Sequence, residues 1–149
     1  FKRIPKIIVI EPEHANCVMQ SIRYGSLKKV NIKKQSIMGG MSCAEVSLVP
    51  WRILKNAVNN CVSVSDKYVP QTLTMLAKKK FSDKSIIAGE CSTPGVISII
   101  SCCNDPLVKK KLEVNEKSNI LIIGCEGDTD KNLYNKLYKI GNQKLKKND

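Results

Sequence analysis

The chain has 149 residues, of which 42% are hydrophobic and 26% charged, values typical of one soluble globular domain. No apolar run reaches the roughly 18 residues that a membrane-spanning helix needs, so we expect no membrane partner. The net charge of +12 comes mainly from lysine, and with an aromatic share of only 5% it favours a solvated basic surface over a nucleic-acid interface.

The first predicted element is a continuous apolar run at residues 6–10, typical of a strand covered on both faces. A helix is predicted over residues 14–24, ended by Gly25, and a short edge strand over residues 29–32. Residues 47–60 have apolar side chains at helical spacing, which predicts a second helix.

The second half of the chain continues the alternation of strands and helices. The predicted elements are strands at 61–64, 85–88 and 119–123, a helix from Asp66 to about 80, a helix from Pro94 to about 103 with Thr93 as its N-cap, a basic helix after 104–106, and a closing helix ended by Gly141. This order predicts an α/β fold of three layers, a mainly parallel sheet with helices on both faces. We expect residues 1–141 to form the domain and 142–149 a polar basic tail.

Seven cysteines are present, an odd number with no CxxC pair, and most lie within apolar stretches. This pattern indicates reduced thiols, most of them in the core, in an intracellular protein that we expect to be cytoplasmic. The single histidine, His14, is expected at the surface, and with no second imidazole we expect no metal site.

Candidate ligand-binding residues follow the predicted strands, because ligands of parallel α/β sheets bind at the carboxyl ends of the strands. The candidates are small or acidic: Gly39 and Gly40, Gly89 and Glu90, and Gly124 and Cys125. Each has a structural alternative, since the glycine pair can form a simple turn, Glu90 can favour a helix dipole and Cys125 can be a core thiol. The GxGxxG and GxxxxGK[ST] motifs are absent, so the residues alone predict no more than a ligand site at strand ends.

At these loops the sequence resembles a known family. The matching stretches are IVIEPEHANC at 8–17, IMGGMSCAE at 37–45, IAGECS at 87–92, NDP at 104–106 and EGDTD at 126–130. Together they resemble the C-terminal portion of diaminopropionate ammonia-lyase, a pyridoxal-phosphate enzyme of fold type II in the tryptophan synthase beta-like superfamily. The resemblance extends from about residue 6 to 141.

The resemblance implies a β-elimination that converts 2,3-diaminopropionate to pyruvate and ammonia, with pyridoxal phosphate as the electron sink, in a homodimer. It implies that Cys125 faces the pyridine nitrogen as a weak hydrogen-bonding group, and that Gly124 lets the backbone pass close to the ring. Gly89 and Glu90 would line the cofactor, and Gly39 and Gly40 would lie near the face of its ring.

The resemblance also places the Schiff-base lysine, the phosphate-binding loop and the acidic catalytic groups upstream of Phe1. We therefore expect no catalytic residue in this chain, which would be an inactive fragment or a degenerate copy. At position 92, where the family has glycine, this chain has Ser92. Two alternatives stay open: a related serine or threonine dehydratase, and a non-catalytic basic remnant that binds nucleic acid or a protein.

Overall fold

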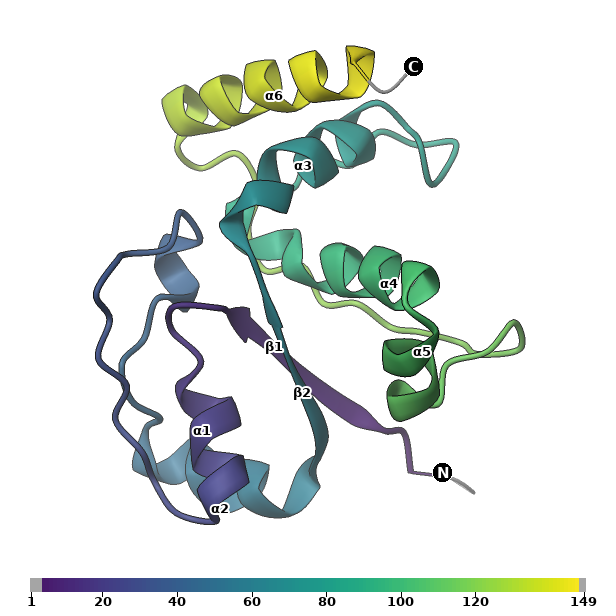
Figure 1. Ribbon diagram of the computed structural model, residues 1–149. Coiled ribbons are helices and arrows are strands. Elements are labelled where there is room, and N and C mark those ends of the chain that lie inside the picture. Colours follow the sequence, from purple (N-terminus) through teal and green to yellow (C-terminus); the bar gives the residue numbers. More distant parts are fainter. Residues whose placement is uncertain (1–3, 148–149) are drawn as a thin grey trace. The chain divides into compact units, whose positions relative to one another are not determined.

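The computed structural model describes residues 4–147, which belong to two compact units, Phe1–Val64 and Ser65–Asp149 (Figure 1). Residues 1–3 and 148–149, the outer ends of the predicted domain and tail, lie outside the described residues. The first unit contains β1 (Ile7–Pro12), α1 (Cys17–Tyr24), η1 (Gly39–Met41), α2 (Leu48–Ala57) and β2 (Val58–Val64). The second contains η2 (Asp66–Tyr68), α3 (Val69–Ala77), η3 (Glu90–Ser92), α4 (Pro94–Asn104), α5 (Pro106–Leu112) and α6 (Lys131–Lys146).

The first unit is built on a parallel pair of strands, β1 and β2. Ile8 pairs with Asn60 and Pro12 with Val64, and α1 packs against both strands. The β-branched run Ile7–Ile10 suits a strand that is covered on one side by a helix. The predicted α/β fold class, with parallel strands and helices, is confirmed by this unit, although β1 and β2 are the strands of the sheet among residues 4–147.

A carboxylate from the strand end fixes the start of α1. Both oxygens of Glu11 accept backbone hydrogen bonds, from Val18 N and Met19 N, at 2.8 Å each. These are amides of the first helical turn, which have no partner inside the helix. The helix therefore begins at Cys17, three residues later than predicted, and ends as predicted at Gly25, whose φ is 65°.

The boundary between α2 and β2 differs from the prediction. The helix ends at Ala57 and the strand begins at once with Val58, so the predicted helix to residue 60 was three residues too long. Val58, Asn59 and Asn60 are weak helix formers. They gain more from pairing with β1, where Asn59 Oδ1 also accepts a hydrogen bond from Ile7 N at 2.8 Å.

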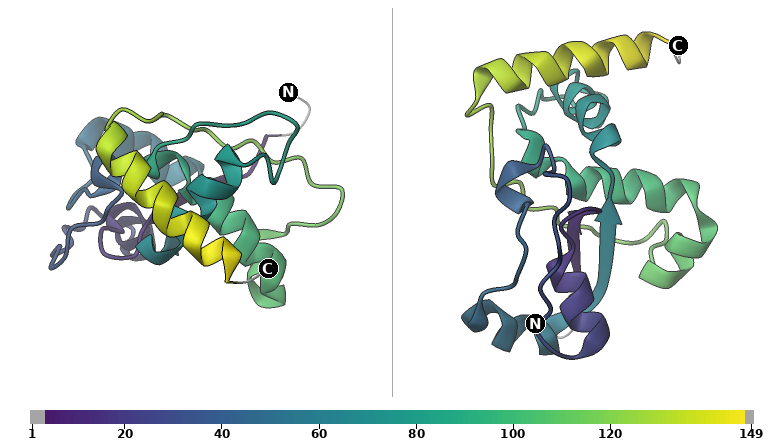
Figure 2. Two further views of the ribbon diagram at one scale, coloured as in Figure 1. Left: turned by 90° about the horizontal axis from the view of Figure 1, so that it is seen from above. Right: turned by 60° about the vertical axis from the view of Figure 1, so that its left-hand side comes forward.

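The second unit is a group of helices in which α6 packs along α3 (Figure 2). The predicted end of the closing helix was wrong, because α6 continues through Gly141 to Lys146. Gly141 does not cap the helix. It is a residue at which α6 lies close to Pro70 and Thr74 of α3. A Cβ there would meet the carbonyl carbon of Pro70 at 2.6 Å and lie closer still to its oxygen and to Thr74 Oγ1.

Three predicted strands, at 29–32, 85–88 and 119–123, form no strand within the described part of the chain. Val30 N makes a single bond to Ala44 O, at 2.8 Å, and Ile86 N one to Leu76 O, at 3.2 Å. Residues 119–123 are apolar but without a neighbouring strand, and a strand requires such a neighbour. Within residues 4–147 no helix has the length and apolar character needed to cross a bilayer.

Candidate functional site

Two of the predicted site segments lie together in the second unit. The turn at residues 89–93 precedes α4, and the segment 124–127 follows the apolar run 119–123. The first contact between them is a backbone hydrogen bond from Gly89 N to Glu126 O, at 3.0 Å. The structure thus brings Gly89, Glu90, Gly124 and Cys125 into one region.

The hydroxyl of Ser92 joins the two segments. Ser92 Oγ donates to Glu126 O and accepts from Glu126 N, each at 2.8 Å. Ser92 is buried, with 7% of its surface exposed, so both bonds are shielded from water. The side chain of Glu126 adds another bond, because its Oε2 accepts from Cys91 N at 3.0 Å.

The glycines at this junction have unequal roles. A Cβ on Gly89 would lie 2.7 Å from Glu126 Cγ and even closer to the carbonyl oxygen of Gly127. Gly89 therefore permits the close approach of segment 124–127, a packing role that the sequence did not indicate. A Cβ on Gly124 would meet Ser92 Cβ and Oγ at 3.4 Å, a tight but tolerable contact.

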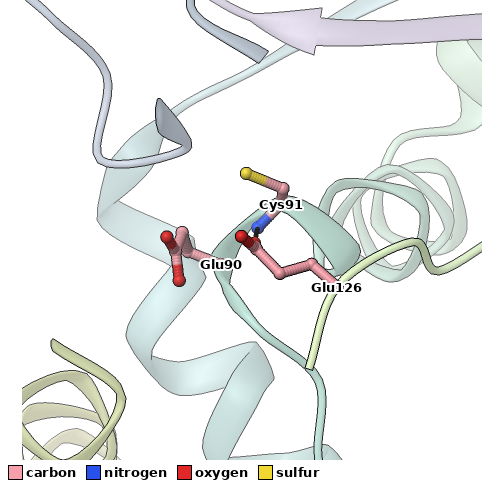
Figure 3. Close-up of side chains that lie close together, drawn as sticks. All are labelled: Glu90, Cys91 and Glu126. Atoms are coloured by element: carbon pink, nitrogen blue, oxygen red, sulfur yellow. Dashed lines mark hydrogen bonds between the residues drawn. The ribbon is translucent and has the colours of Figure 1, made fainter. Parts of the chain in front are cut away.

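Glu90, Cys91 and Glu126 form a compact group of polar side chains (Figure 3). Each offers one potential metal-ligand atom, and these atoms lie within 4.8 Å of one another, although the sequence predicted no metal site. One Glu126 oxygen already accepts a hydrogen bond from Cys91 N, and Glu90 is only half-buried.

Cys125 is exposed, so the alternative of a core thiol is wrong. Its neighbours on both sides, Gly124 and Glu126, contact the turn at 89–93. Cys125 thus has an accessible thiol and lies between two residues that are close to the turn at 89–93.

The EGDTD run at residues 126–130 also has a structural role. Asp130 Oδ1 caps α6 by accepting from Asn132 N at 3.0 Å and Leu133 N at 2.9 Å. The hydroxyl of Tyr134 is buried and has no hydrogen-bond partner among the described residues. Burial, followed by the nearby Asp128 carboxylate, raises the pKa of Tyr134.

Gly39 and Gly40 belong to the first unit, where they open the short helix η1. Both are exposed, and a Cβ on Gly39 would meet no atom within 4 Å. This is open space, so packing within the unit does not account for a glycine at position 39.

Sequence reasoning assigned no role to Ser92 or to the Glu126 carboxylate. Thr93 is the N-cap residue of α4, as predicted, but its Oγ1 donates to Glu90 O at 2.9 Å and makes no capping hydrogen bond to the helix. The one available signal was Ser92 itself, a hydroxyl-bearing residue next to the predicted site residues Gly89 and Glu90.

Comparison with known proteins gives a consistent result. The diaminopropionate ammonia-lyase of Escherichia coli K12 is 29% identical over 126 residues, which are 83% of this chain and 32% of that protein. The crystal structure of the E. coli enzyme with an aminoacrylate-PLP azomethine reaction intermediate matches with a TM-score of 0.79 and 27% identity, covering 91% of this chain and 35% of the other. Maize serine racemase shares the fold, with a TM-score of 0.66 at 18% identity, covering 91% of this chain and 40% of the other. No family model matches.

These matches confirm the resemblance found in the sequence, and the structural neighbours confirm the fold-type-II class. The chain spans about a third of the length of the curated relatives that it matches.

Proposed function

We propose that this chain, a homologue of the diaminopropionate ammonia-lyases, forms the C-terminal part of a pyridoxal-phosphate-binding domain in such a lyase. The intact protein would convert 2,3-diaminopropionate to pyruvate and ammonia. The observation that carries this proposal is the 29% identity over 126 residues, which are 83% of the chain.

The residues present fit the cofactor. The exposed thiol of Cys125 is available to a ring nitrogen as a weak hydrogen-bonding group. Gly89 contributes indirectly, by letting the segment that bears Cys125 approach the turn.

Pyridoxal phosphate, when bound, withdraws electrons from the amino acid so that its α-proton and β-amino group can leave. In this chain Cys125 would orient the ring and leave its nitrogen largely unprotonated, because a thiol is a poor proton donor. Gly124 would let the backbone lie close to the ring, and Glu90 would line the cofactor from the half-buried end of the turn. The group that holds the cofactor covalently would come from the remaining two-thirds of the protein.

We also propose a homodimer in the cytoplasm, acting on a small amino acid. The cysteines support a reducing compartment, since their number is odd and the sequence has no CxxC pair. A domain at residues 1–141 followed by a basic tail at 142–149 also stays a proposal.

A chimera tests the proposal. The matched third of the E. coli enzyme is replaced by this chain, and cooperative unfolding of the purified chimera is checked first. We expect it to bind pyridoxal phosphate and to release pyruvate from 2,3-diaminopropionate. A chimera that unfolds cooperatively and binds the cofactor, but forms pyruvate only from serine and 2-oxobutyrate from threonine, would favour a dehydratase.

The net charge of +12 supports the competing function of nucleic-acid binding. Binding of the 149-residue chain to duplex DNA, measured at several salt concentrations, distinguishes nucleic-acid binding from the proposed lyase function. A steep fall in affinity with salt, at affinities well above those of nonspecific lysine-rich proteins, would favour the basic remnant. We expect only weak binding, because arginine forks and stacking aromatics are scarce.

A further inference from the structure

The backbone of the segment that carries Cys125 is hydrogen-bonded to the rest of the unit at one end. From Asn119 to Cys125, the backbone makes no hydrogen bond to any other described residue. The next residue, Glu126, makes three backbone bonds, to Gly89 N and in both directions to Ser92 Oγ. The position of Cys125 along this segment is therefore set at Glu126.

Ser92 contributes two of those three bonds through one atom. A hydroxyl can donate and accept at the same time, and Ser92 Oγ does both with the same residue, at 2.8 Å each way. Removing the hydroxyl would leave Glu126 N without a partner in a partly buried place.

Ser92 also lies against the residue before Cys125. Its Cβ and Oγ are both 3.4 Å from the point where a Cβ on Gly124 would stand. Ser92 is thus hydrogen-bonded to the residue after Cys125 and lies close to the residue before it.

We propose that Ser92 is a positioning residue, whose hydroxyl fixes Glu126 and thereby holds the Cys125 thiol in place against the cofactor ring. This rests on the proposed function. In this role Ser92 would act through its two hydrogen bonds to Glu126.

The first test needs no cofactor. Amide hydrogen exchange is measured in the 149-residue chain and in Ser92→Ala. Ser98→Ala is the matched control, since Ser98 is equally buried in the same unit but bonds to Gly95 O at 2.8 Å. We expect exchange at Glu126 to become at least about tenfold faster in Ser92→Ala, because two hydrogen bonds are lost there. The rate of alkylation of Cys125 should also change, whereas the rate for Cys103, which is exposed in α4, should stay the same.

Equal exchange at Glu126 in the two variants would overturn the proposal. If Ser92→Ala does not fold, Ser92→Cys keeps the size of the side chain but weakens both bonds. The same change, smaller in extent, is then expected, and its absence counts against the proposal.

The second test uses the chimera loaded with pyridoxal phosphate. Ser92→Ala should shift the cofactor's absorption spectrum in the same direction as Cys125→Ala, and Ser98→Ala should not. Faster exchange at Glu126 with an unshifted spectrum would make Ser92 merely structural and would overturn the positioning role. A parent chimera that binds no cofactor would instead remove the proposed function, while the exchange experiment would still report on the Ser92–Glu126 contact.

Discussion

The cysteines show how strongly the surroundings of one residue type differ along this chain. Cys17, Cys91 and Cys102 are buried, whereas Cys43, Cys103 and Cys125 are exposed. Burial, together with the nearby Glu11 carboxylate and Cys43, raises the pKa of the Cys17 thiol to about 11. Since the thiolate is the nucleophile, the environment decides which of these thiols can react.

Alkylation with iodoacetamide at about pH 8 should therefore be selective. Cys43, Cys103 and Cys125 should be modified first, because their thiols are accessible. Cys17 should react last, since with a pKa of about 11 only about one molecule in a thousand carries the thiolate at that pH. Peptide mass spectrometry over a time course gives the order, and early modification of Cys17 would contradict the structure of the first unit.

Glu11 should make the first unit depend on pH. Burial raises the pKa of this carboxyl above its ordinary value, and the amides of Met19 and Val18 oppose the shift without cancelling it. The folded state then binds the proton more tightly than the unfolded state, so Glu11 contributes stability that is lost as the pH rises through the folded pKa. The advantage of the parent over Glu11→Gln in urea unfolding should be larger at about pH 5 than at about pH 7.

Glu45→Gln is the control for that experiment, because Glu45 is exposed in the same unit. An equal advantage of the parent over Glu11→Gln at both pH values would show that Glu11 does not titrate as its burial requires.

At the scale of elements, the contact between α3 and α6 depends on a small residue. Gly141 lies against Pro70 and Thr74, and the Thr74 hydroxyl donates to Pro70 O at 2.9 Å and lies 3.1 Å from Tyr138 O. The helices can approach so closely because position 141 has no side chain. A glycine inside a helix weakens it slightly, so the packing of α6 on α3 must offset that loss.

Gly141→Ala should therefore destabilise the second unit by about 1–3 kcal/mol, in spite of the better helix propensity of alanine. The added Cβ would meet the backbone of Pro70, which cannot move aside cheaply. Thermal or urea unfolding measures the change. Gln143→Ala, at an exposed position of the same helix, should have almost no effect, and equal stability of the two variants would contradict the close contact.

Local signals predicted the helices better than the strands. Apolar spacing and caps located α4 from Pro94 and α5 after Asp105, whose carboxylate accepts from Leu107 N at 2.9 Å as an N-cap should. Strands depend on partners distant in the sequence, so the apolar run 119–123 was predicted as a strand although the described residues supply no neighbour for it.

The candidate site was predictable only in part. Strand-end loops and the resemblance pointed to Glu90, Gly124 and Cys125, because such loops carry the ligands of parallel sheets. The contact of Ser92 with Glu126 was not predictable, since it joins residues 34 apart and needs the fold to bring them together.

At the scale of the whole molecule, the apolar run 119–123 exposes large hydrophobic side chains to solvent. Exposure alternates along the run, from 46% at Ile120 through 87% at Leu121 and 38% at Ile122 to 81% at Ile123. Alternation is the pattern of a strand, and Ile122 lies against Gly95 of α4 while Leu121 and Ile123 lie bare. The curated relatives are about three times as long as the region that they share with this chain.

The 149-residue chain should therefore self-associate at micromolar concentration, because unpaired apolar strands pair with other chains. Leu121→Lys should reduce association measured by light scattering or sedimentation velocity. Leu107→Lys is the matched control, since Leu107 is 72% exposed on α5 outside the run. A parent chain that stays monomeric, or an equal effect of the two variants, would contradict this explanation.

The most direct measurement is a crystal structure of the chimera with pyridoxal phosphate bound. The account predicts that Cys125 Sγ lies within hydrogen-bonding distance of the pyridine nitrogen and that Ser92 Oγ keeps both bonds to Glu126. A cofactor bound with its pyridine nitrogen against another side chain, or no cofactor in this region, would contradict the proposed site.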